Sequence, residues 1–282
     1  MTSVSTQQDG YRLGSVAPAR ESRLVLALND VTAGIASWPI WMRLGWNDIL
    51  QKYRRSVLGP FWLTASAAIM TIALGFLYAK LFQSPIDDFL PYLCVGLLFW
   101  NYISSYLLEA STMFVGSESY IKQIRLPYSV YAYRATWSKV IILAHNFVIY
   151  FGVIAYFRIW PGAVALLAIP AFIVVTFNCA LASMLIGMLS ARFRDIPQLM
   201  LSLVQLFFFA TPIMWKASLL KEHAYIAIFN PFYSLIEIVR APLLGELPST
   251  GNYLVVVLVT ILNVLIAGAF FVRFRSRISY WV

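Results

Sequence analysis

The stretch QKYRRSVLGPFWLTASAAIM, residues 51–70, joins a dense cluster of cations to a run without any charge. Lys52, Arg54 and Arg55 precede residues 56–79, which contain no Asp, Glu, Lys or Arg. A helix needs about 20 apolar residues to cross the hydrocarbon core of a bilayer. The stretch therefore predicts a first membrane span whose N-terminal end is positively charged.

The composition of the whole chain is that of a membrane protein. Of the 282 residues, 61% are hydrophobic and 12% are charged, whereas about a quarter of the residues in soluble domains are charged. Uncharged stretches of spanning length recur along the chain, and the fold class we predict is an all-α polytopic membrane protein. Its six transmembrane helices are expected at about residues 57–81, 90–109, 136–157, 163–190, 197–215 and 252–272.

The basic residues fix the expected orientation. If the six spans alternate in direction, sixteen of the 21 Lys and Arg residues fall on one side of the membrane and five on the other. Because positively charged loops stay in the cytoplasm, both termini are expected there. The net charge of +9 is then explained by topology, and no nucleic-acid partner is expected.

The residues before the first span divide into two parts. Residues 1–35 form an N-terminal extension, expected to be partly disordered, without the apolar core of a cleavable signal peptide. Residues 36–55 carry apolar side chains at helical spacing and predict an amphipathic helix in the cytoplasmic interface. Its tryptophans suit that depth: Trp38, Trp41 and Trp46. A helix of a small soluble domain is the alternative. Residues 56–282 are expected to form the transmembrane domain.

The connection between the second and third spans, residues 109–139, predicts a short cytoplasmic helix. Ser117 or Ser119 is expected to cap its start, and Pro127 to stop it. Such a helix, held between two spans, is either a lever for a cytoplasmic partner or an ordinary connector.

Residues 216–251, between the fifth and sixth spans, contain an apolar segment that is too short to cross. The segment is broken at Asn230 and Pro231, and apolar residues then recur at helical spacing up to Pro242. We therefore predict short re-entrant helices on the outer face, which dip into the outer leaflet or pack at the exit of a pore.

Several chemistries find no support in the sequence. The middle of each expected span lacks Asp, Glu, Lys and Arg, the usual marks of an ion pathway. His145 is expected to make an interhelical hydrogen bond rather than to relay protons. No glycine is followed by lysine, so a phosphate-binding loop is absent, and no catalytic or metal-binding set is visible. Cys94 and Cys179 are expected to be buried thiols. The chain is predicted to be neither an enzyme nor the holder of a cofactor or metal.

Three motifs resemble those of a known family. They are YRRSVLGPFW (53–62), FRDIPQLMLSLVQLFFFATPIMW (193–215) and NPFYSLIEIVRAPLLG (230–245). Together they look like the membrane-spanning subunits of bacterial ABC exporters of polysaccharides, most closely the lipopolysaccharide O-antigen permeases. The likeness runs from about residue 36 to the C-terminus, and residues 1–35 have no counterpart in it.

The resemblance implies a homodimer in the bacterial inner membrane, surrounded by membrane lipids, with two cytoplasmic ATPase subunits that bind ATP and Mg²⁺. The substrate it implies is a polysaccharide linked to polyprenyl pyrophosphate. Capsular polysaccharide, teichoic acid, or a small drug or lipid are alternative cargoes. A membrane-embedded structural or assembly protein without a transport role is a further alternative.

The resemblance also suggests three groups of site residues. Aromatic side chains offer a moving sugar chain many weak contacts, or simply face lipid and neighbouring helices; the channel candidates are Trp62, Trp100, Tyr102, Phe207, Phe208 and Phe209. Cations attract a pyrophosphate headgroup, or merely mark topology; these candidates are Lys52, Arg54, Arg55, Arg192 and Arg194. Contacts to the ATPase are expected from Tyr120, Ile121, Lys122, Ile124, Arg125 and Pro127.

Overall fold

The computed structural model describes residues 22–54, 61–217, 219, 222 and 225–282, and every regular element in these ranges is a helix. The all-α prediction is confirmed for this part of the chain. Residues 1–21 of the N-terminal extension lie outside the described residues.

Five helices among the described residues are long and apolar enough to cross a bilayer. The fourth of them, α7, continues a 3₁₀ turn at Gly162–Leu167. The five are α3 (Phe61–Leu81), α4 (Ile86–Ala110), α6 (Ser129–Phe157), α7 (Ala168–Arg192) and α11 (Thr250–Phe274).

The span predicted at 197–215 is shorter than expected. It forms α8, Ile196–Ala210, whose 15 residues extend about 22 Å at 1.5 Å per residue. This is less than the hydrocarbon core of about 30 Å. Thr211 is already in an extended conformation, because Pro212 disfavours a helical residue before it and lacks an amide hydrogen.

The third long helix begins earlier than the sequence suggests, at Ser129 rather than near residue 136. The charge that delayed the predicted start, Arg134, lies inside α6 and is paired with a carboxylate on α2. Lys139, also inside α6, is paired with a carboxylate on α4. The connection before it contains α5, Glu118–Gln123. The predicted short helix is thus confirmed, although Ser117 at its N-cap makes no side-chain capping bond.

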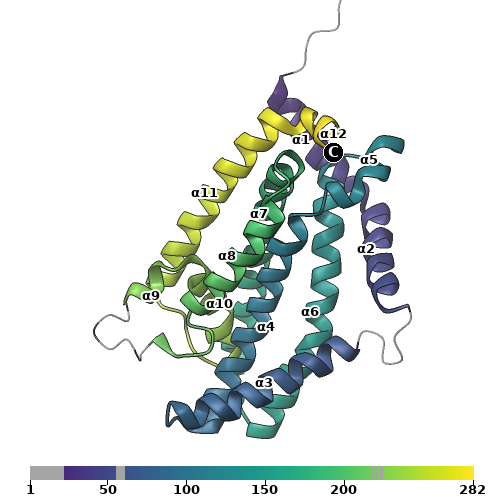
Figure 1. Cartoon of the computed structure of the whole chain (residues 1–282). Helices are drawn as coiled ribbons and strands as arrows, with labels where there is room; N and C mark the ends of the chain where they lie inside the picture. The colour runs from purple at the N-terminus through teal and green to yellow at the C-terminus, as the bar shows by residue number, and fades with distance from the viewer. Residues whose placement is uncertain (1–21, 55–60, 218, 220–221, 223–224) are drawn as a thin grey trace, which may run out of the picture.

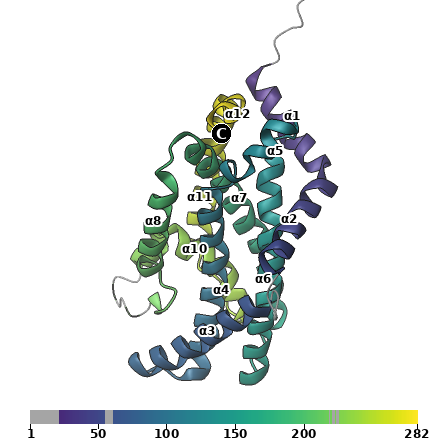
Figure 2. The ribbon, with the colours of Figure 1, turned by 45° about the vertical axis from the view of Figure 1, so that its right-hand side comes forward.

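Helix α4 lies at the centre of the bundle (Figures 1 and 2). In the most apolar 18-residue stretch of α4, 78% of the residues are buried, whereas the corresponding share in the other four long helices is 17–28%. The outward faces of those helices expose large apolar side chains, such as Leu254, Leu258 and Leu265 on α11. An apolar surface of this extent is stable in lipid rather than in water.

Two helices precede the long ones: α1, Arg23–Ala36, and α2, Trp38–Tyr53, bent by 67° relative to each other. Helix α2 runs alongside α6 (Figures 1 and 2). Gly45 allows this close approach, since a Cβ at Gly45 would lie 2.8 Å from the carbonyl oxygen of Arg134. Of the three tryptophans, Trp41 packs on the aromatic rings of α6, while Trp38 and Trp46 are exposed.

The short helices α9 (Tyr225–Phe229) and α10 (Pro231–Leu243) lie at the opposite end of the bundle from α1 and α12 (Ile278–Trp281), as Figure 1 shows. Asn230 caps α10 by accepting from the amides of Phe232 and Tyr233 at 3.0 and 3.3 Å. The predicted break at Asn230 and Pro231 is confirmed. Helix α10 is largely buried in contact with α4, α7 and α11, so it packs on protein.

Candidate functional site

A polar cleft opens between α3, α4 and α6. Its volume is about 480 Å³. Each helix contributes one face, because the lining residues recur at intervals of three and four. We call it the polar cleft; it is lined by Ser66, Ala67 and Met70 of α3, Leu98, Asn101, Tyr102 and Ser105 of α4, and Lys139, Ile142, Leu143 and Asn146 of α6.

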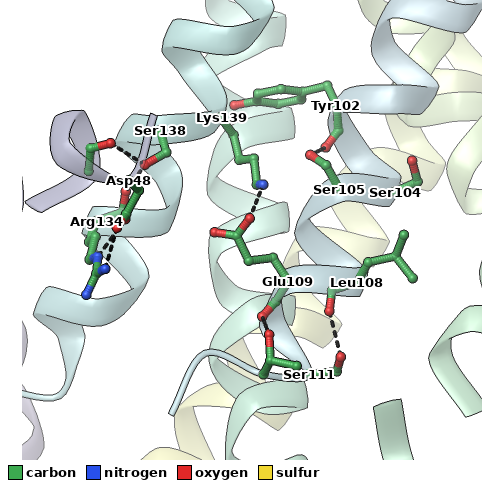
Figure 3. Close-up of polar contacts among 12 residues, drawn as sticks. Asp48, Tyr102, Ser104, Ser105, Leu108, Glu109, Ser111, Arg134, Ser138 and Lys139 are labelled. Atoms are coloured by element: carbon green, nitrogen blue, oxygen red, sulfur yellow. Dashed lines mark hydrogen bonds and ion pairs between the residues drawn. The ribbon is translucent and has the colours of Figure 1, made fainter. Parts of the chain in front are cut away.

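Lys139 is the charged residue among those that line the polar cleft. Figure 3 shows its side chain extending from α6 toward the carboxylate of Glu109 on α4, with which it forms an ion pair. The lysine side chain is only 6% exposed. A buried ammonium requires such a partner, because its desolvation is otherwise uncompensated. The sequence prediction excluded charges only from the middle of each span, and Lys139 lies near the start of the third predicted span, 136–157.

Two polar groups of the cleft keep hydrogen-bonding capacity. Asn146 accepts from Thr64 of α3 at 3.1 Å, a bond that ties α3 to α6. Among the described residues, the Asn146 amide nitrogen donates no hydrogen bond, and the exposed side chain of Asn101 makes none at all. These groups are available to a polar ligand in the cleft, and neutral hydroxyl groups match them, since the one cation is already paired.

Among the residues that the structure describes, His145, next to Asn146, does not make the expected interhelical bond. Its Nδ1 lies 2.8 Å from the carbonyl oxygen of Ile141 in the same helix.

A second hollow adjoins the first on the side of α8. Its volume is about 280 Å³, and it shares Ala67, Met70 and Asn101 with the polar cleft. Trp100 of α4 and Phe208 of α8 line it, with ring centroids 5.8 Å apart. We call it the aromatic hollow. It gives the polar cleft an aromatic continuation toward α8.

The aromatic channel candidates fall into two groups. Trp100, Tyr102 and Phe208 line the two hollows, although Tyr102 also donates or accepts a hydrogen bond with Thr176 at 2.8 Å. The other three lie elsewhere. Phe207 packs on Phe232 of α10 at 4.8 Å, and the remaining two, Trp62 and Phe209, are exposed on the outside of the bundle.

The structure does not bring the basic candidates together. Arg192 lies over the ring of Trp281, at the end of the bundle formed by α1 and α12, and Arg194 is exposed close by in sequence. Helix α2 runs from that end toward the middle of α6, so Arg54 at its C-cap lies apart from them (Figure 2). The side chain of Lys52 and the whole of Arg55 are outside the described residues.

The residues expected to contact an ATPase form an exposed surface on and after α5. Tyr120 and Ile124 are 41% and 49% exposed. Lys122 forms an ion pair with Glu118 and lowers the pKa of that carboxyl by hydrogen bonding and charge. The other three are partly or fully exposed: Ile121, Arg125 and Pro127. This surface lies at the same end of the bundle as α1 and α12 (Figure 1).

Sequence reasoning missed the polar residues of the cleft: Ser66, Asn101, Ser105, Lys139 and Asn146. Their signal was weak, because each is a single polar residue within an apolar helix, a pattern that also fits interhelical hydrogen bonds. Only the crossing of three helices shows that these residues share one space.

The similarity of this chain to known proteins covers the helices that form the two hollows. The family model for the ABC-2 type transporter matches residues 41–244, from α2 to the end of α10. The O-antigen export system permease protein RfbA of Klebsiella pneumoniae is 24% identical over 199 residues, 67% of this chain and 74% of that protein. The protein of the same name from Myxococcus xanthus is 25% identical over 203 residues, 69% of this chain and 76% of that protein. The resemblance to polysaccharide-export permeases is confirmed, and the chain belongs to the ABC-2 type transporter family.

Proposed function

We propose that this chain is the membrane-spanning permease of an ABC exporter that moves a lipid-linked polysaccharide, most closely an O-antigen of lipopolysaccharide, outward across the bacterial inner membrane. The single observation that carries the proposal is the polar cleft with its aromatic continuation, built from helices of the segment that the family model matches. The curated relatives in O-antigen export support the choice of cargo.

The cleft suits a sugar chain for two reasons. The side-chain amides of Asn101 and Asn146 are matched to sugar hydroxyls, while Trp100 and Phe208 offer apolar faces to the C–H surfaces of sugar rings. Each contact is individually weak, so a sugar chain that moves through the cleft is not trapped at one position. We propose that two copies of the permease form a homodimer around the path of the substrate.

The orientation is part of the proposal. The end formed by α1, α5 and α12 carries Lys122, Arg125, Arg192, Arg275 and Arg277, and it is assigned to the cytoplasm by the positive-inside rule. This assignment places both termini in the cytoplasm and α9 and α10 in the outer leaflet. It also places the predicted helix over residues 36–55 in the cytoplasmic interface.

The energy source is assigned to a separate subunit. We propose that two ATPase subunits, holding ATP and Mg²⁺, dock on the exposed surface around α5, and that this chain itself binds no cofactor. A pyrophosphate headgroup is proposed to contact the cations near the cytoplasmic end, with Arg192 and Arg194 the pair best placed for it.

The test is reconstitution of the permease with its ATPase in vesicles that contain a polyprenyl-linked glycan. ATP-dependent appearance of the glycan on the far side, detected by a lectin, is the expected result. Parallel vesicles that contain capsular polysaccharide, teichoic acid or a small fluorescent lipid identify the cargo class. Movement of the small lipid alone overturns polysaccharide export, and movement of none overturns a transport role in this system.

A further inference from the structure

The two ends of the described chain meet at one place, and both lie outside residues 41–244 that the family model covers. Asp30 of α1 forms an ion pair with Arg275, directly after α11, at 3.0 Å. The carboxylate side chain is only 4% exposed. Arg275 also donates to the carbonyl oxygen of Leu26 at 2.7 Å. Helix α1 is therefore held to the C-terminal end of α11 by a buried charge and a backbone contact.

Asp30 also binds the start of α6 through hydrogen bonds. Its two carboxylate oxygens accept from the backbone amides of Tyr128 and Ser129, at 3.1 and 3.0 Å. These amides belong to the N-terminal end of α6, where the helix leaves amides unpaired and favours a negative charge. The hydroxyl of Ser129 donates back to the carbonyl oxygen of Asp30 at 2.8 Å. One carboxylate thus joins α1, α6 and α11.

Helices α1 and α6 pack closely where they meet at Gly34. A Cβ placed on Gly34 of α1 would lie 2.0 Å from the Ser129 hydroxyl oxygen and 2.9 Å from the ring of Tyr133. Both neighbours are held, the hydroxyl by Asp30 and the tyrosine by its bond to Val31. Glycine at this position lets α1 lie directly on α6.

The C-terminal segment holds the α5 loop from the other side. Ile278 and Val282 are buried in one apolar cluster with Phe114, which precedes α5, and Met188 of α7. Lys122 of α5 donates to the carbonyl oxygen of Val282 at 3.4 Å. The connection 111–128 is therefore enclosed between α1 and the C-terminal segment, next to the ends of α6, α7 and α11.

We infer that α1 and residues 275–282 form a clasp that makes the α5 loop and the ends of α6 and α11 move as one unit, with Asp30 as its positioning residue. The inference rests on the proposed function, since it assigns to α5 the force of an ATPase. Without the clasp, part of a push on α5 is absorbed by the 111–128 connection, because fewer contacts then link the loop to the long helices, such as those of Phe114 with Tyr131 and of Arg134 over Tyr120.

The experiment compares variants of the complete permease–ATPase complex in vesicles by the amount of glycan moved per ATP hydrolysed. Asp30→Ala is expected to lower this ratio by about fivefold or more, a usual size for coupling between sites, with ATP hydrolysis continuing. Asp30→Asn, which keeps one of the two acceptor oxygens but loses the charge, and Arg275→Gln are expected to lower it less. The matched control is Asp88→Ala, which removes the ion pair with Lys216 at the far end of the bundle and leaves the ratio unchanged.

A wild-type ratio in Asp30→Ala overturns the clasp. So does a parallel loss of transport and hydrolysis in all three clasp variants, since this is the outcome of a merely structural role. Hydrogen exchange of the permease without glycan gives a separate readout. Loss of Asp30 is expected to speed exchange of residues 118–131 but not of the buried centre of α4. If the wild-type complex moves no glycan, the proposed function fails on its own, and hydrogen exchange then tests the clasp separately. Unchanged exchange of residues 118–131 in Asp30→Ala overturns the clasp, and faster exchange supports it.

Discussion

Lys139 of α6 and Glu109 of α4 form an ion pair in which the lysine side chain is 6% exposed and the glutamate side chain 43% exposed. The two ends of this pair are therefore not equivalent. Water reaches the carboxylate but scarcely reaches the ammonium group, and the free energy of losing each partner differs accordingly.

Removing the carboxylate is expected to destabilise the protein more than removing the ammonium. Glu109→Gln leaves a buried positive charge without its partner and is expected to cost about 1–3 kcal/mol. Lys139→Met removes the charge together with its desolvation, and its cost is expected to be smaller. Thermal unfolding in detergent gives the comparison, with the exposed-pair variant Glu118→Gln as the control. An equal or larger shift for Lys139→Met contradicts this account.

Asn101→Leu separates a ligand-binding role from a structural one. The Asn101 side chain is exposed and makes no hydrogen bond among the described residues, so its loss is expected to leave the unfolding temperature unchanged. Transport of a lipid-linked glycan is expected to fall about tenfold, which corresponds to about 1.4 kcal/mol and is the size of a lost polar contact. Asn47→Leu, the same exchange at an exposed position of α2, is the control. Full transport by Asn101→Leu removes this residue from the path.

Two exposed positions at opposite ends of the bundle test the orientation. Ser119→Cys lies in α5, and Glu246→Cys follows α10. The native thiols, Cys94 and Cys179, are buried and provide a low background. In intact cells, a membrane-impermeant maleimide is expected to label Glu246→Cys and to label Ser119→Cys only after the membrane is opened. The reverse pattern would place α5 outside and exclude an ATPase contact there.

Asn230 joins α8 and α10 at the end of the bundle opposite α1 and α12. Its side-chain oxygen caps α10, and its amide nitrogen donates to Ala210 and Thr211 at the end of α8, each at 3.1 Å. Asn230→Ala loses both functions and is expected to lower the unfolding free energy by about 1–2 kcal/mol. Asn230→Asp keeps the cap but loses the two donors, and an intermediate shift in the unfolding temperature is expected. If Asn230→Asp unfolds at the wild-type temperature, the bonds to α8 contribute nothing, and if the two variants behave alike, the cap contributes nothing.

Much of the fold follows from local patterns. The apolar stretches predict the long helices, since an uncharged run of about 20 residues has few other stable arrangements. The break at Asn230 and Pro231 and the short α5 are equally local. The start of α6 was misplaced because Arg134 looks like a loop residue until Asp48 is known to pair with it, and the two residues are 86 positions apart.

The sequence by itself determined a membrane-embedded helical protein with a cation-rich end, and its motifs indicated the transporter family. Length, charge and turn residues act within one segment and are readable there. Only the tertiary structure decided that Asn101, Lys139 and Asn146 share a cleft, that Trp100 faces Phe208, and that Asp30 joins α1 and Arg275 to the start of α6. These contacts depend on the angles at which distant helices cross, and those angles are set by packing across the whole bundle.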